Sequence, residues 1–177
     1  MASPLEYIGR QWARFRLLWG RRREPVSLRE TIQSAEGLLV CLPEHGIPRA
    51  EELVSLIKAL PVRKVTLLSA HPVETPGADL EMLMLSKDDV GWFRLPRKTL
   101  RDRIKTGGFD VAIALHRNFS ITSAYLCVLS GARVRVGLGS GSGDDGTFFN
   151  VHYRGGGTAL RETCQGLARL FREIGGR

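Results

Sequence analysis

The stretch that decides the fold is residues 107–138, which read GGFDVAIALHRNFSITSAYLCVLSGARVRVGL. The apolar run at 111–115 is typical of a strand that is covered on both faces, and a second such run follows at 134–138. Between them, residues 121–129 place apolar side chains at helical spacing. A strand, a helix and a second strand in this order form a parallel pair with a right-handed crossover, so the segment predicts an α/β fold.

The same alternation of strand and helix extends through most of the chain. Apolar runs predict further extended segments at 38–42, 65–68, 92–95 and 147–153. Periodicity predicts helices after Ser27 and at 49–60, 96–105 and 158–174, with one further helical turn in the weakly patterned region near 80–85. The pattern predicts a doubly wound parallel sheet whose usual strand order, 3-2-1-4-5, makes the first and fourth strands neighbours.

Length and composition indicate one globular domain. The chain has 177 residues, of which 43% are hydrophobic and 25% charged, and no apolar run approaches the ~18 residues of a membrane-spanning helix. Arginines interrupt the hydrophobic residues near the N-terminus, which argues against a signal peptide. Cys41, Cys127 and Cys164 lie far apart in apolar runs, as small buried residues in a reducing compartment would. We therefore expect a cytoplasmic protein.

The positive charge is concentrated at one end of the chain. The net charge is +8, and the first 23 residues contain six arginines but only one acidic residue, Glu6. A nucleic-acid-binding protein usually spreads its basic residues over the face that follows the phosphates, so this distribution argues against nucleic acid as the partner. It also divides the chain into a basic N-terminal segment, residues 1–25, and a domain, residues 26–177.

Residues 4–22 predict an amphipathic helix. Leu5, Ile8, Trp12, Phe15 and Trp19 recur at spacings of three and four residues, and arginines occupy the other side. The helix could lie peripherally on the inner face of an anionic membrane, pack its apolar stripe on the domain or a partner chain, or remain disordered. In the first interpretation the membrane-contact residues are Trp12, Phe15, Trp19, Arg14, Arg21, Arg22 and Arg23.

Two polar loops follow the first and fourth predicted strands. Ligands of doubly wound sheets bind at the carboxyl ends of the strands, where the strand order reverses. We therefore expect the two loops to face each other and form a binding crevice, although solvated loops without a function remain the alternative. The candidate residues are Glu44, His45, Gly46, His116, Arg117 and Asn118.

Other candidate motifs fail simple tests. The glycine-rich loop at 139–146 has neither the Gly-Lys-Ser/Thr of a phosphate loop nor a helix that opens directly after it. Asp144 and Asp145 have no histidine or cysteine at ligand spacing, so we expect no metal and no cofactor. Ser123 and Ser130 lack the strand-turn-helix elbow of a hydrolase nucleophile.

The decisive stretch resembles the family-nine glycosyltransferases, the heptosyltransferases of lipopolysaccharide assembly. The resemblance covers most of residues 37–153 and is most specific between Phe109 and Leu138. It rests on Phe109-Asp110 before an apolar strand that ends in Leu115-His116, on Ser130-Gly131-Ala132-Arg133, on Arg135-x-Gly137, and more weakly on Phe148-Phe149-Asn150.

The resemblance implies a Rossmann-like half of a GT-B fold. Enzymes of this family bind the acceptor sugar in the first domain and the nucleotide-sugar donor in the second, and the chain matches the first domain alone. The family also places a Gly-Asp pair after its first strand, with the aspartate as the base, whereas Ile47 follows Gly46 here. Glu44 is the nearby carboxylate that could substitute for that base.

Three functional hypotheses follow. The first is a pseudoenzyme, inactive alone, that binds a glycan or glycolipid acceptor at the cytoplasmic membrane face, with Arg117 holding an anionic sugar or phosphate. The second is an active glycosyltransferase half that is completed by a separate donor-domain protein. The third is a non-enzymatic interaction module whose basic helix binds anionic lipid or nucleic acid.

Overall fold

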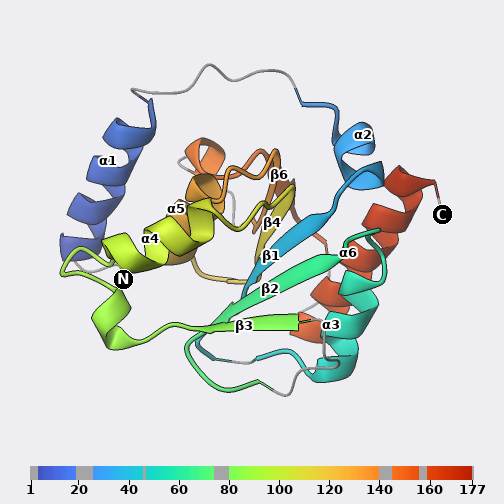
Figure 1. The fold of residues 1–177 in the computed structure, drawn as a ribbon, viewed down its shortest axis with the longest axis horizontal. Helices are drawn as coiled ribbons and strands as arrows, with labels where there is room; N and C mark the ends of the chain where they lie inside the picture. The colour runs from blue at the N-terminus through green and yellow to red at the C-terminus, as the bar shows by residue number, and fades with distance from the viewer. Residues whose placement is uncertain are drawn as a thin grey trace.

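The protein is an α/β structure built on a six-stranded, all-parallel sheet (Figure 1). The structure, a computed structural model, describes residues 4–18, 26–45, 47–73, 80–139, 145–155 and 159–176. The strand order is β3-β2-β1-β4-β5-β6. The strands are β1 (Gly37–Cys41), β2 (Lys64–Ser69), β3 (Leu80–Met84), β4 (Val111–Ala114), β5 (Val134–Leu138) and β6 (Val151–Tyr153).

Helices cover both faces of the sheet, as Figure 1 shows. One face packs against α2 (Leu28–Gln33), α3 (Ala50–Ile57) and α6 (Leu160–Gly175). The opposite face packs against α4 (Lys98–Lys105) and α5 (Ile121–Leu129), with α1 (Pro4–Leu18) outside them. Short 3₁₀ turns, η1 (Lys87–Asp89) and η2 (Asp145–Thr147), complete the described elements.

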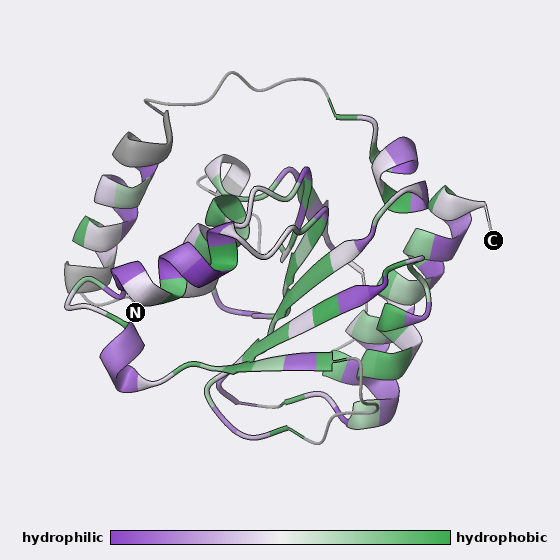
Figure 2. Ribbon diagram, viewed as in Figure 1, coloured by the Kyte–Doolittle hydropathy of each residue, from purple (hydrophilic) through white to green (hydrophobic). Residues whose placement is uncertain are grey.

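The central strands are apolar on both faces because both faces are covered. Leu38 and Val40 of β1 lie in the core beneath α3 and α6, whereas Leu39 and Cys41 lie in the core beneath α5. Figure 2 shows β1 and β4 predominantly hydrophobic, with hydrophilic residues on the surrounding helices. The three cysteines are buried and unpaired by disulfides, as expected.

The structure confirms the predicted sheet and its switch of strand order. The predicted strands at 38–42, 65–68, 111–115 and 134–138 correspond to β1, β2, β4 and β5, and β6 extends the sheet beyond β5. The helices predicted after Ser27 and at 49–60, 96–105, 121–129 and 158–174 also form, as α2 to α6, with bounds that differ by at most a few residues. Ser27 caps α2, since its side chain accepts a hydrogen bond from the Glu30 amide at 3.4 Å.

Two predictions between β2 and α4 were wrong. Residues 80–84 form the edge strand β3 and not a helical turn; their Leu, Met and Glu residues favour helices, but parallel pairing with β2 overrides that preference. Residues 92–95 were expected to be a strand, and they form a tight turn instead. The Gly91 amide donates to the Leu95 carbonyl at 2.8 Å, and an isolated antiparallel bridge joins Val90 and Pro96 on either side of it.

Two polar side chains of the 109–150 region join separate backbone segments by hydrogen bonds. The Asp110 carboxylate accepts hydrogen bonds from the amides of Glu36 and Gly37, at 2.8 and 3.2 Å, and so ties the start of β1 to the start of β4. The side chain of Asn150 accepts from the Arg135 amide at 2.7 Å and donates to the Arg133 carbonyl at 2.6 Å. These residues satisfy backbone groups near the amino ends of β1 and β5, and neither of them lines the pocket at the carboxyl ends of the strands.

Candidate functional site

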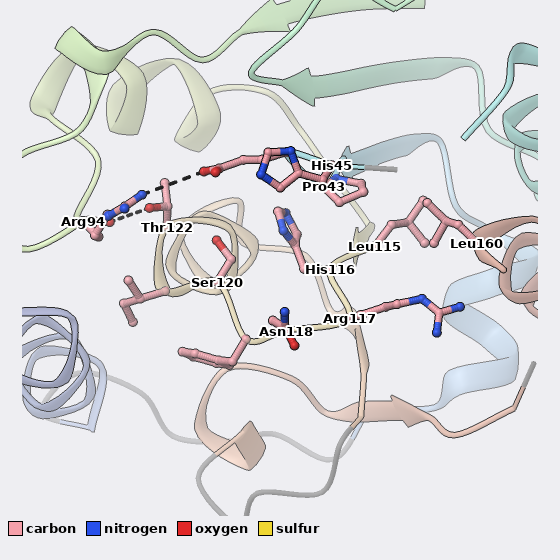
Figure 3. Close-up of a pocket in the computed structure, with 13 residues that line it drawn as sticks. Pro43, His45, Arg94, Leu115, His116, Arg117, Asn118, Ser120, Thr122 and Leu160 are labelled. Atoms are coloured by element: carbon pink, nitrogen blue, oxygen red, sulfur yellow. Dashed lines mark hydrogen bonds and ion pairs between the residues drawn. The ribbon is translucent and has the colours of Figure 1, made fainter. Parts of the chain in front are cut away.

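A pocket of about 490 Å³ lies at the carboxyl ends of β1 and β4 (Figure 3). These two strands are neighbours, and the chain leaves β1 toward β2 on one side and β4 toward β5 on the other. The pocket therefore occupies the topological switch point, where ligands of doubly wound sheets bind. A second hollow, of about 660 Å³, shares Glu44, His45, Arg94 and His116 with it and reaches Lys87.

The loop after β1 supplies one wall of the pocket. Pro43, Glu44 and His45 line it, as the sequence predicted, while Gly46 lies outside the described residues. Ile47, which stands where the resembling family has its aspartate, packs against the core beneath α3 and α6. Among the described residues that line the two hollows, Glu44 is the one carboxylate.

The loop after β4 supplies the opposite wall. His116, Arg117 and Asn118 all line the pocket, so the structure brings the two predicted loops together. In Figure 3 the His116 ring points toward His45, whereas the Arg117 side chain points away from His116 and toward Leu160 at the start of α6. Arg117 thus lies at the far end of the pocket from the histidine pair.

His116 forms a hydrogen-bonded pair with a serine of α5. The Nε2 atom of its ring lies 2.8 Å from Ser123 Oγ, and Ser120 Oγ lies 3.4 Å from the same hydroxyl. Burial lowers the pKa of His116 to about 4, with a smaller opposing effect from the Glu44 carboxylate. The imidazole is therefore neutral near pH 7. With Nε2 paired to Ser123, its other ring nitrogen can donate or accept a hydrogen bond according to the tautomer.

Arg94 and Thr122 are pocket residues that sequence reasoning missed. The Arg94 guanidinium lies 3.9 Å from the Glu44 carboxylate, and both side chains are more than half exposed. Thr122 Oγ1 donates to the Arg94 carbonyl at 2.6 Å, which joins the 91–95 turn to α5 beside the pocket (Figure 3). Arg94 was not predicted as a site residue because residues 92–95 were expected to form a strand and belong to no recognisable motif.

The lining suits a hydroxylated or anionic ligand. Two guanidinium groups, two imidazoles, a carboxylate and several hydroxyls converge on one hollow, and each can donate or accept hydrogen bonds. Among the described residues, no group of three or more His, Cys, Asp or Glu side chains is placed to hold a metal ion. The arrangement can bind a polar ligand by charge and hydrogen bonding.

The predicted membrane-contact residues are described only in part. Trp12 is 46% exposed and Arg14 is half-buried on α1. The side chain of Phe15 is not described, and Trp19, Arg21, Arg22 and Arg23 lie outside the described residues. In the part of the chain that the structure covers, no helix has both the length and the hydrophobicity needed to cross a bilayer.

Fold and pocket together define a Rossmann-like α/β domain with a polar ligand site at its switch point. No protein-family model, curated protein or solved structure matches the chain.

Proposed function

We propose that this protein binds a glycan or glycolipid acceptor in the switch-point pocket, as a single-domain relative of the acceptor half of family-nine glycosyltransferases. The observation that carries the proposal is the convergence of the β1 and β4 loops on one polar hollow. The sequence resemblance supplies the ligand class, because acceptors of that family carry many hydroxyls and anionic groups. The pocket supplies matching donors and acceptors.

Each side of the pocket has a distinct role in this proposal. Arg94 and Arg117 stand at different places along the hollow, so a ligand that bears two anionic groups can contact both. Between them, the neutral His116 offers a ring nitrogen to a sugar hydroxyl without repelling either arginine. His45 adds a second imidazole on the opposite loop.

We further propose that the chain is catalytically inactive by itself. Proton abstraction from an acceptor hydroxyl needs a base within hydrogen-bonding distance of that proton. Ile47 has no titratable group and packs against the core. The Glu44 carboxylate faces the Arg94 guanidinium, which makes it part of an exposed ion pair in the pocket lining.

A second candidate function is a glycosyltransferase half that works with a separate donor-binding chain. The observation in its favour is that Glu44 lines the pocket on the wall opposite His116, where it could reach a bound hydroxyl. Mixing this protein with such a chain and a nucleotide-sugar should then transfer sugar, and Glu44→Gln should abolish the transfer.

The binding proposal is tested by calorimetric titration with a phosphorylated core oligosaccharide of lipopolysaccharide. Arg94→Ala and His116→Gln should each weaken binding by about tenfold, the effect of losing one hydrogen bond to a charged or buried group. Arg103→Ala is the matched control, since Arg103 forms a comparable exposed ion pair with Glu81 on α4 and β3, away from the pocket. Equal affinity in all four proteins would refute the proposal.

A further inference from the structure

We infer that the outer surface of α1 and the 91–94 turn docks on an anionic lipid bilayer and that this docking brings the mouth of the pocket to the membrane. The docking stands on its own observations, whereas its meaning for a glycolipid ligand rests on the proposed function. The docking residues are Tyr7, Ile8, Trp12, Trp92 and Phe93.

The α1 helix approaches the domain most closely through its small residues. Gly9 and Ala13 are buried, and a Cβ atom added at Gly9 would collide with the backbone carbonyl of Phe93. In contrast, Ile8 and Trp12, which belong to the stripe, are about half exposed. The apolar stripe was expected to bind either the membrane or the protein, and its described members, Ile8 and Trp12, keep about half of their surface exposed, while the adjacent column of small residues makes the closest contact.

The 91–94 turn adds two aromatic side chains beside this helix. Trp92 is 87% exposed and Phe93 is 45% exposed, although the turn that carries them is firmly held. The Arg94 amide donates to the Gly91 carbonyl at 2.9 Å, and Thr122 holds the Arg94 carbonyl from α5. A constrained turn therefore presents a tryptophan and a phenylalanine to the surroundings next to α1.

The contact between the helix and the turn makes these residues one surface. Gly9 brings the α1 backbone against Phe93, so residues that are some 80 positions apart in the sequence lie side by side (Figure 1). Arg10 fixes the helix from its other flank, with its guanidinium 4.1 Å from the centre of the Phe119 ring. An exposed apolar group of this kind commonly marks an interaction site.

The charged residues near this surface indicate which kind of partner it binds. Around the turn, residues 86–105 contain seven basic residues and three acidic ones, and the part of α1 whose side chains are described, residues 7–14, contains Arg10 and Arg14 and no acidic residue. Figure 2 shows α4, which follows the turn in the sequence, as largely hydrophilic. Aromatic side chains within a basic surround match the layer of anionic headgroups over acyl chains, in which indole rings reside and guanidinium groups pair with phosphate. The partner we assign is therefore an anionic bilayer.

The pocket lining is joined to this surface through Arg94. Its backbone belongs to the turn that presents Trp92 and Phe93, while its guanidinium faces Glu44 in the pocket wall. When Trp92 and Phe93 rest in the headgroup layer, Arg94, the next residue and part of the pocket lining, lies close to the lipid surface. A ligand whose polar head projects from the bilayer could then reach the pocket while its lipid part stays in the membrane.

The experiment is vesicle flotation of the full chain with phosphatidylcholine vesicles and with vesicles that also contain phosphatidylglycerol. The expected result is binding to the anionic vesicles, reduced by about tenfold in Trp92→Ser/Phe93→Ser, as loss of this apolar burial requires. Met84→Ser is the matched control, because Met84 is a similarly exposed apolar residue on the edge strand β3. The control should float like the unaltered protein.

The outcomes separate the two proposals. Unchanged flotation of the double variant, or equal binding to both kinds of vesicle, would overturn the inference. Absence of flotation together with self-association that the double variant loses would assign the surface to a second copy, which also overturns it. Calorimetric titration of the double variant with the soluble oligosaccharide tests the pocket alone. If neither the double variant nor the unaltered protein binds the oligosaccharide, the proposed function is refuted, and the flotation result still stands.

Discussion

The Nε2 atom of His116 lies 2.8 Å from the hydroxyl of Ser123, across the loop that separates β4 from α5. This pair explains how a histidine that follows a buried strand is held in the pocket wall. Burial lowers its pKa to about 4, so the ring is a neutral hydrogen-bonding group over the physiological range of pH.

The lowered pKa of His116 predicts a loss of stability in acid. The unfolded chain takes up the His116 proton near pH 6.5, and the folded protein resists it until about pH 4. The contribution of this residue is therefore complete above pH 6.5 and disappears as the pH falls toward 4. It amounts to at most about 3 kcal/mol. Urea denaturation of wild type and His116→Gln at both ends of this range measures it. An identical pH dependence of the two proteins would contradict the prediction.

Arg94 predicts a difference between two small substitutions. Its φ angle of 58° lies in the left-handed region, which glycine adopts freely and other residues adopt at a cost. Arg94→Gly should therefore be more stable than Arg94→Ala by about 1 kcal/mol, although both lose the guanidinium. Thermal denaturation compares them directly. An alanine variant that is at least as stable as the glycine variant would show that the turn is not strained.

Gly9 predicts a specific loosening of α1. Gly9→Ala favours the helix itself by about 1 kcal/mol, yet the added methyl group meets the Phe93 carbonyl and must displace it or the helix. We expect α1 to remain helical but to separate from the 91–94 turn, with faster hydrogen exchange at the buried Ala13. Gln11→Ala, on the exposed side of the same helix, is the control. Unchanged exchange in Gly9→Ala would mean that the helix does not dock through this residue.

Glu44 predicts a gain in affinity for anions. Glu44→Gln removes the carboxylate that faces the Arg94 guanidinium, which leaves that group available to a phosphate. Because the pair is exposed, the gain should be modest, about two- to fivefold. Titration with the phosphorylated oligosaccharide measures it. A large loss of affinity would instead show that the carboxylate itself contacts the ligand.

Asn150 predicts a loss of stability without a loss of binding. Asn150→Ala removes one acceptor from the Arg135 amide and one donor from the Arg133 carbonyl, at an expected cost of about 1–3 kcal/mol. Urea denaturation should show this cost, and titration of the folded variant should show unchanged affinity. Reduced affinity in the folded variant would mean that the 133–150 region contributes to the pocket.

Local sequence patterns were sufficient to predict the central strands but not the structure of the region between β2 and α4. Val111, Ile113 and their neighbours could only be a covered strand, because so many consecutive apolar residues need cover on both faces. The amino acids at 80–84 favour a helix, but these residues form a strand because they pair with the otherwise unpaired edge of β2. The His116 and Ser123 pair was also missed, since a strand end and a helix residue seven positions apart meet only through the intervening turn.

The amino-acid sequence by itself determined the parallel sheet, the reversal of strand order beside β1, and the two polar loops that leave β1 and β4, because hydrophobic periodicity and crossover handedness are local properties. Tertiary structure alone decided that Arg94 reaches Glu44, and that Gly9 and Ala13 are buried against the domain while Trp12 stays about half exposed. These contacts depend on which backbones can approach closely, and close approach is set by packing between segments that are distant along the chain.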